Sequence, residues 1–69
     1  MDINRITYHV KKHSSLSDAL GRDYIGFVRV HHEGGTYTVR SLVRRISRGD
    51  AKQDAVRIGH DILFENFGN

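Results

Sequence analysis

Hydrophobic and polar residues alternate along three separate segments of the chain, with the two-residue period of a β-strand that buries one face. The predicted strands run from Ile3 to Lys12, from Tyr24 to His32 and from Thr36 to Ile46. Gly34 and Gly35 separate the second strand from the third and favour a tight hairpin, because glycine tolerates positive φ. The positions expected on the buried face are Ile6, Tyr8, Val10, Val28, Val30, Tyr37, Val39 and Val43.

The last third of the chain changes to helical spacing, and Ser47 or Asp50 can cap the start of the helix. Gly59 interrupts it in the middle and, together with Ala55, leaves a flat patch that lets the helix lie close to a sheet. Gly68 is placed to end it. The predicted apolar stripe consists of Ala51, Ala55, Ile58, Gly59, Ile62 and Leu63. The acidic residues expected on the solvent side are Asp54, Asp61 and Glu65.

Together these elements predict an α+β fold in which a three-stranded antiparallel sheet carries one C-terminal helix on one face (β-β-β-α). The chain of 69 residues is expected to form a single domain over residues 1–69, with a loop from Ser14 to Arg22. Its core is thin, and several large apolar residues have no obvious cover. These are Phe27, Leu42, Phe64 and Phe67. Burial by a second copy, and so a homodimer, is left open.

Composition narrows the functional classes. The chain has no cysteine, so disulfides and thiolate zinc sites are excluded. No apolar run approaches the roughly 20 residues that a membrane helix needs, so no membrane contact is expected. The first residues, Met1 to Arg5, lack the features of a signal peptide, which predicts a cytoplasmic protein.

Catalysis is not expected, because the sequence shows no nucleophile motif, and its acidic residues are scattered over loops and the helix. The histidines have no metal-ligand spacing, although His9 and His31 would be neighbours on the open sheet face in one strand register. His31 and His32 point to opposite faces of their strand and cannot share a metal there. We therefore expect a chain that is not an enzyme and that needs no metal or cofactor.

Charge identifies the candidate binding site. Eleven Lys and Arg against eight Asp and Glu give a formal net charge of +3. The sheet face opposite the helix collects many of the cations and no acidic residue, whereas the exposed side of the helix is expected to be largely acidic. A solvated sheet face normally mixes signs, so this face suits a phosphate backbone or an acidic protein, and a plain solvated face is the third alternative. The candidate binding residues are Arg5, His9, Lys11, Phe27, Arg29, His31, Arg40 and Arg44.

The strand-strand-strand-helix order from Ile3 to Leu63, with its basic sheet face, resembles the arm-binding N-terminal domains of tyrosine recombinases, which insert such a sheet into DNA. The chain also resembles small proteins of phages and mobile elements, including anti-CRISPR inhibitors. That likeness lies in its size, its lack of cysteine and the amphipathic stretch Asp50-Ala51-Lys52-Gln53-Asp54-Ala55.

The second resemblance implies a non-catalytic, stoichiometric inhibitor of a host complex that handles nucleic acid, and it supplies the leading hypothesis. The alternative is a small DNA- or RNA-binding domain that uses the basic sheet face directly. The candidate binding residues lie on the side of the sheet that the helix leaves open, and the more negative helix side is left as a second candidate surface.

Overall fold

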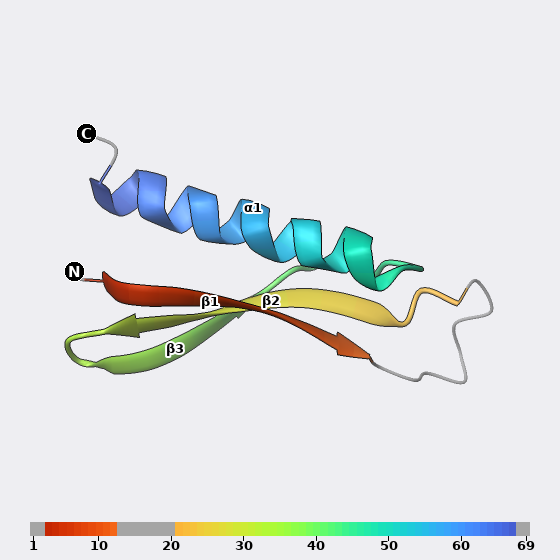
Figure 1. The fold of residues 1–69 in the computed structure, drawn as a ribbon, viewed down its shortest axis with the longest axis horizontal. Helices are drawn as coiled ribbons and strands as arrows, with labels where there is room; N and C mark the ends of the chain where they lie inside the picture. The colour runs from red at the N-terminus through yellow and green to blue at the C-terminus, as the bar shows by residue number, and fades with distance from the viewer. Residues whose placement is uncertain (1–2, 13–20, 68–69) are drawn as a thin grey trace.

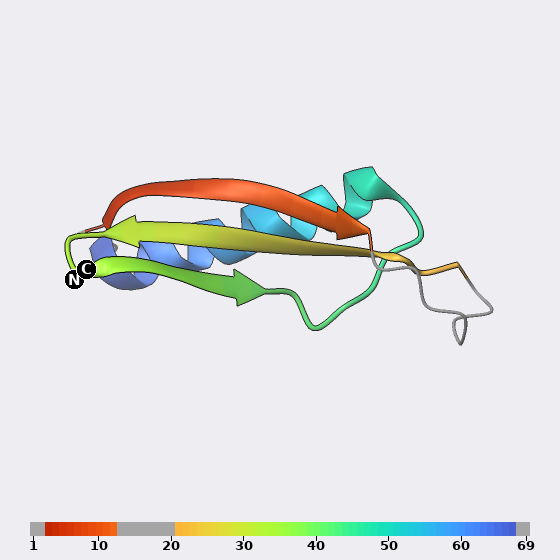
Figure 2. The same cartoon turned by 90° about the horizontal axis from the view of Figure 1, so that it is seen from below.

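The computed structural model describes residues 3–12 and 21–67, with side chains as far as residue 65, and confirms the predicted β-β-β-α fold (Figure 1). The strands form one antiparallel sheet in the order β1-β2-β3, and α1 lies along one face of it (Figure 2). Residues 14–20 of the predicted loop and the predicted helix stop at Gly68 lie outside the described residues. The elements are β1 (Ile3–Lys12), β2 (Tyr24–His32), β3 (Gly35–Arg40) and α1 (Arg48–Phe67).

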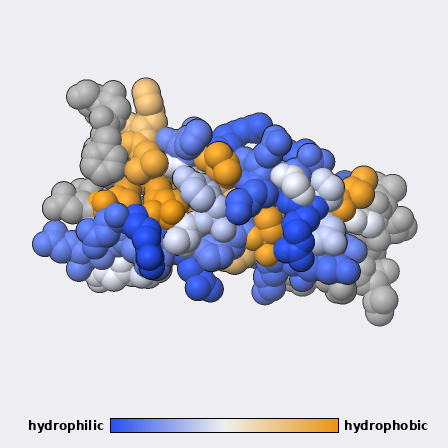
Figure 3. All heavy atoms as spheres, viewed as in Figure 1, coloured by the Kyte–Doolittle hydropathy of each residue, from blue (hydrophilic) through white to orange (hydrophobic). Residues whose placement is uncertain are grey.

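The core forms where the central strand β2 meets the small residues of α1. Val28 and Val30 on β2 and Ala51 and Ala55 on α1 have no exposed surface. The apolar side chains packed around this centre are Ile3, Ile6, Tyr8, Tyr37, Val39, Ile58 and Ile62. Seen from the side, hydrophilic residues cover most of the surface, and apolar residues show between α1 and the sheet (Figure 3). The alternation in the sequence therefore identified the buried face of the sheet correctly.

Two glycines allow α1 to approach the sheet closely. A Cβ on Gly26 would collide with the backbone carbonyl of Ala51, so the first turns of the helix lie directly against β2. A Cβ on Gly59 would lie 2.5 Å from the ring of Tyr8. The role predicted for Gly59 is confirmed, and Gly26 supplies the matching flat place on the sheet.

An irregularity near the start of β1 brings Ile3 into the core. Ile3 pairs with His32 and Arg5 pairs with His31, so Asn4 is one extra residue of β1 between partners that are adjacent on β2. The extra residue is a bulge, which reverses the alternation at that point. Ile3 consequently joins Ile6 on the buried face, although strict alternation assigns these two positions to opposite faces.

The third strand is shorter than predicted, because it ends at Arg40 and not at Ile46. The Ser41 hydroxyl accepts a hydrogen bond from the Val43 backbone N–H (3.0 Å), which turns the chain away from the sheet. The chain returns at Arg45, whose backbone exchanges hydrogen bonds with Tyr24 (3.0 and 2.8 Å). If the β3 register continued, Val43 would lie opposite Tyr24. Arg45 lies there instead, so the detour adds two residues to the chain between β3 and this bridge.

This detour overturns the placement of Val43 in the core, since its side chain is 46% exposed. Leu42 is 94% exposed and Phe64 is 71% exposed, as expected for residues without cover. Phe27, by contrast, is half-buried, and nothing is described of the Phe67 side chain. Whether a second copy covers the exposed residues stays a prediction.

Ser47 is the residue that caps α1. Its hydroxyl accepts a hydrogen bond from the Asp50 backbone N–H (3.1 Å), three residues into the helix. This satisfies one of the backbone donors that the first turn leaves without a helical partner. Of the two caps left open by the sequence, the geometry selects Ser47, and Asp50 adds a negative charge in the first turn.

Asp54 was wrongly predicted to face solvent. Its side chain is 8% exposed and accepts two hydrogen bonds from Arg45, from Nε (2.8 Å) and from an Nη atom (3.0 Å). The return of the chain beside Tyr24 carries Arg45 to the first turns of α1, which no helical period can reveal. Hydrogen bonding by the Arg45 guanidinium is the main cause that lowers the pKa of Asp54 below its ordinary value of 3.8.

This pair predicts a pH-dependent contribution to stability. Because folding lowers the pKa of Asp54, its carboxylate stabilises the fold above its unfolded pKa, and the contribution disappears as the pH falls through the folded pKa. Asp54→Asn should therefore lower the urea midpoint at neutral pH, and the difference from wild type should shrink below about pH 4. Asp61→Asn, at an exposed carboxylate of the same helix, is the control. An equal deficit of Asp54→Asn at neutral and acidic pH would contradict this role.

Candidate functional site

The strand register arranges the outward side chains in rows across the sheet. Strands β1 and β2 pair Arg5 with His31 and Thr7 with Arg29, while β2 and β3 pair Arg29 with Thr38. Four rows follow one another along the sheet: Arg5, His31 and Thr36; Thr7, Arg29 and Thr38; His9, Phe27 and Arg40; and Lys11 with Ile25. We call these side chains the outer face, since α1 covers the opposite side (Figure 2).

An aromatic pair stands in the middle of the outer face. The rings of His9 and Phe27 stack with centroids 5.0 Å apart and planes inclined by 16°. A hydrogen bond between Thr7 Oγ1 and His9 Nε2 (2.8 Å) fixes the imidazole from the same strand. Stacking and hydrogen bonding together hold the Phe27 ring in place and account for its partial burial.

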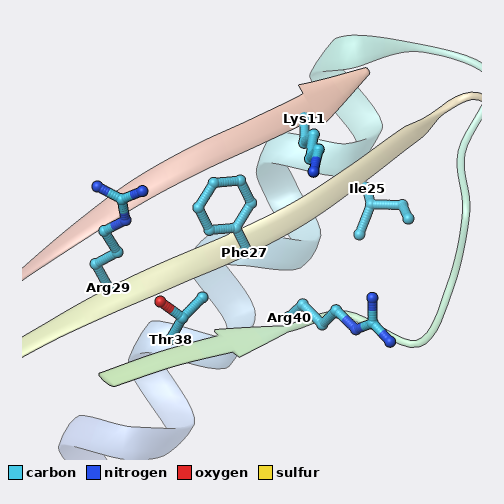
Figure 4. Close-up of a pocket in the computed structure, with 6 residues that line it drawn as sticks. All are labelled: Lys11, Ile25, Phe27, Arg29, Thr38 and Arg40. Carbon is cyan, nitrogen blue, oxygen red and sulfur yellow. The ribbon is translucent and has the colours of Figure 1, made fainter. Parts of the chain in front are cut away.

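Three cations, one from each strand, surround Phe27. Lys11 on β1, Arg29 on β2 and Arg40 on β3 reach the rim of a hollow of about 480 Å³ (Figure 4). Ile25 and Thr38 complete its lining, so that apolar, hydroxyl and cationic groups meet there. Ile25 was not among the predicted site residues, although its position, two residues before Phe27, assigns it to the same face.

Among the described residues, no acidic side chain balances the positive charge of the outer face. Within the described strands, none of its members is acidic, and none of Lys11, Arg29 and Arg40 takes part in an ion pair. All three side chains are exposed. Such cations attract counterions from solvent, and a polyanionic ligand would release them.

Arg44 is not part of a paired strand, so the register assigns it to no row of the outer face, and its part in binding stays a prediction. It lies in the detour after β3, where the strand alternation no longer holds. Of the eight candidate binding residues, the other seven lie on the outer face. They are Arg5, His9, Lys11, Phe27, Arg29, His31 and Arg40.

The histidines of the outer face are not neighbours. His9 lies opposite Phe27, and His31 lies four residues further along β2, about 13 Å away at strand spacing. His31 shares a hydrogen bond with Thr36 (3.2 Å), and His32 packs against Tyr37 on the helix side. Among the described residues, no group of three or more potential metal ligands comes together.

The exposed side of α1 is not largely acidic, which corrects the expected polarity of the domain. Asp54 is buried and paired with Arg45, so it does not contribute to the exposed side. The charged residues exposed on the described part of α1 have both signs: Arg48, Lys52 and Arg57, against Asp50, Asp61 and Glu65. Uniform charge therefore distinguishes the outer face from the helix, and the outer face becomes the better candidate site.

Comparison of the chain with protein-family models, curated proteins and solved structures returned no match. The resemblances to recombinase arm-binding domains and to anti-CRISPR inhibitors therefore remain predictions. No helix in the described part of the chain combines the length and apolarity needed to cross a membrane. The functional assignment depends on the geometry of the outer face.

Proposed function

We propose that this chain is a non-catalytic binding domain that contacts nucleic acid through the outer face of its sheet. One observation carries the proposal: cations from three strands surround an aromatic ring on a face that has no acidic side chain. Arginine forks fit phosphate oxygens, and an aromatic ring can stack on a base. We propose a cytoplasmic location in accordance with the sequence.

The chemistry favours an extended polyanion because the cations come from successive rows along the sheet. Arg5, Lys11, Arg29 and Arg40 lie in four different rows, so each one can meet a separate charge of an extended polyanion. Thr38, beside Arg29, adds a hydroxyl that can donate to a phosphate or sugar oxygen. A single small anion would need donors that converge on one point, as a bidentate clamp does.

The affinity of the wild-type protein for nucleic acid should depend steeply on salt. Four phosphate contacts predict a plot of log K against log salt with a slope of about −3 for a single strand, or nearer −4 for a duplex. Fluorescence anisotropy with labelled oligonucleotides of random sequence, from low to physiological salt, measures this slope. Absence of binding at micromolar protein in low salt would overturn the proposal.

The inhibitor hypothesis uses the same face against an acidic or exposed protein surface, and it now takes second place. Leu42 and Ile46, which are 94% and 67% exposed in the segment after β3, are the observation that favours a protein partner. The anisotropy experiment separates the two, because a protein-directed inhibitor needs no affinity for random nucleic acid. A protein that binds no oligonucleotide and forms a stoichiometric complex with a host nucleic-acid-handling assembly would place the inhibitor first.

A further inference from the structure

The position of Phe27 points to a more specific ligand than nucleic acid in general. We propose that an unpaired base stacks at Phe27, so that the ligand is a single strand and not a duplex. This inference depends on the proposed function, and it assigns the chemistry of the hollow at the centre of the outer face. Single-stranded DNA and RNA share the base and phosphate groups that it requires.

The first support is the location of the ring among the cations. Phe27 lies in the hollow, between Lys11 on one side and Arg29 on the other (Figure 4). In a duplex, neighbouring base pairs cover the faces of each base, so a central aromatic ring would reach only groove edges and sugars. An unpaired base offers a free π-face, and base-aromatic stacking contributes to affinity without requiring a particular sequence.

The second support is that neighbouring side chains hold the Phe27 ring in place. His9 stacks on Phe27, and the Thr7 hydroxyl bonds the imidazole, so β1 holds the ring before any ligand arrives. Ile25 extends the apolar floor next to the ring. A ring held in this way loses little conformational entropy when a base contacts it, which favours binding.

The third support is the distribution of the cations over the rows of the outer face. Lys11, Arg40 and Arg29 occupy successive rows, and Arg5 occupies the next row, so each row supplies one cation. Successive rows are two residues apart, or about 7 Å. This repeat is comparable to the distance between neighbouring phosphates of an extended single strand. A strand of about four nucleotides lying along β2 would therefore place one phosphate at each row.

The test compares one short oligothymidylate, one oligouridylate and one DNA duplex of the same length by fluorescence anisotropy. The variants are Phe27→Leu, which removes the ring but stays apolar, and Phe27→Tyr, which keeps the ring. Phe27→Leu should weaken single-strand binding by about fivefold or more and duplex binding by much less, while Phe27→Tyr should bind like wild type. Oligothymidylate and oligouridylate reveal whether DNA or RNA is preferred.

Tighter binding of the duplex, or a Phe27→Leu variant that binds single strands like wild type, would overturn the inference and leave the proposed function in place. Failure of wild type to bind any of the three probes would overturn both. An NMR measurement on the wild-type protein tests stacking without any variant that could misfold. Stacking should shift the Phe27 ring proton resonances upfield when oligothymidylate is added. Unchanged ring resonances at saturation would contradict stacking.

Discussion

Gly26→Ala should destabilise the protein by about 2–4 kcal/mol, which is a large part of the stability expected for a domain of this size. The new methyl group would collide with the backbone carbonyl of Ala51, and the backbone nitrogen of Ala55 lies 3.0 Å from the same point. Since neither group can rotate away, α1 would have to move off β2. That movement would loosen the packing of Val28 and Val30 against the helix.

Urea denaturation followed by circular dichroism measures this effect, and Gly49→Ala provides the control. Gly49 lies near the start of α1, and a Cβ there would have no atom within 4 Å. The same substitution should leave stability unchanged or raise it by up to about 1 kcal/mol, because alanine favours the helix. Equal urea midpoints for the Gly26→Ala variant and wild type would show that the helix does not lie as close to the sheet as described.

The sequence was sufficient to predict the elements whose burial is periodic. Alternation identified β1 and β2, glycines identified the hairpin, and the spacing of Ala51 and Ala55 identified the buried side of α1. Each of these depends on contacts that repeat with the geometry of one element. The fold class and the existence of an open sheet face follow from such local patterns.

The segment from 41 to 47 was not predictable in the same way. Its residues continue the alternation of β3, yet a hydrogen bond between the Ser41 side chain and the Val43 backbone turns the chain aside. The Arg45–Asp54 pair depends on where that detour ends. Both arise from contacts between elements, and for this reason Val43 and Asp54 were misplaced.

The sequence predicted which residues share the outer face, but it did not predict how they are arranged on that face. Alternation collected Arg29, Phe27 and Lys11 on one side, but it did not reveal which residues lie in the same row. The register depends on the bulge near Ile3 and on the hairpin, and it decides that His9 meets Phe27 and not His31. The aromatic stack and the rows of single cations are therefore results of the three-dimensional structure.

Charge reversal at Arg29 and Arg40 should have the largest effect on binding. The double variant Arg29→Glu, Arg40→Glu places two carboxylates beside Phe27, where phosphates would otherwise be attracted. Affinity for an oligonucleotide in low salt should fall by about 100-fold or more, because like charges placed together cost several kcal/mol. Both arginines are exposed, so stability should change little.

A matched control separates this local effect from the change in net charge. The double variant Lys52→Glu, Arg57→Glu alters the net charge by the same amount at exposed positions of α1. It should weaken binding only slightly through long-range electrostatics, and this small effect should vanish at physiological salt. Equal losses in the two double variants would indicate attraction by the whole protein and not contact at the outer face.

The salt dependence of binding by these double variants shows whether cations of the outer face contact phosphates. Each lost contact means one fewer phosphate neutralised, so fewer counterions are released on binding. The slope of log K against log salt for Arg29→Glu, Arg40→Glu should therefore fall in magnitude by about 1.5 to 2 relative to wild type. The slope for Lys52→Glu, Arg57→Glu should fall by much less, because only a weak long-range attraction is lost. A sheet variant that keeps the wild-type slope, or a helix variant that loses as much, would contradict the account.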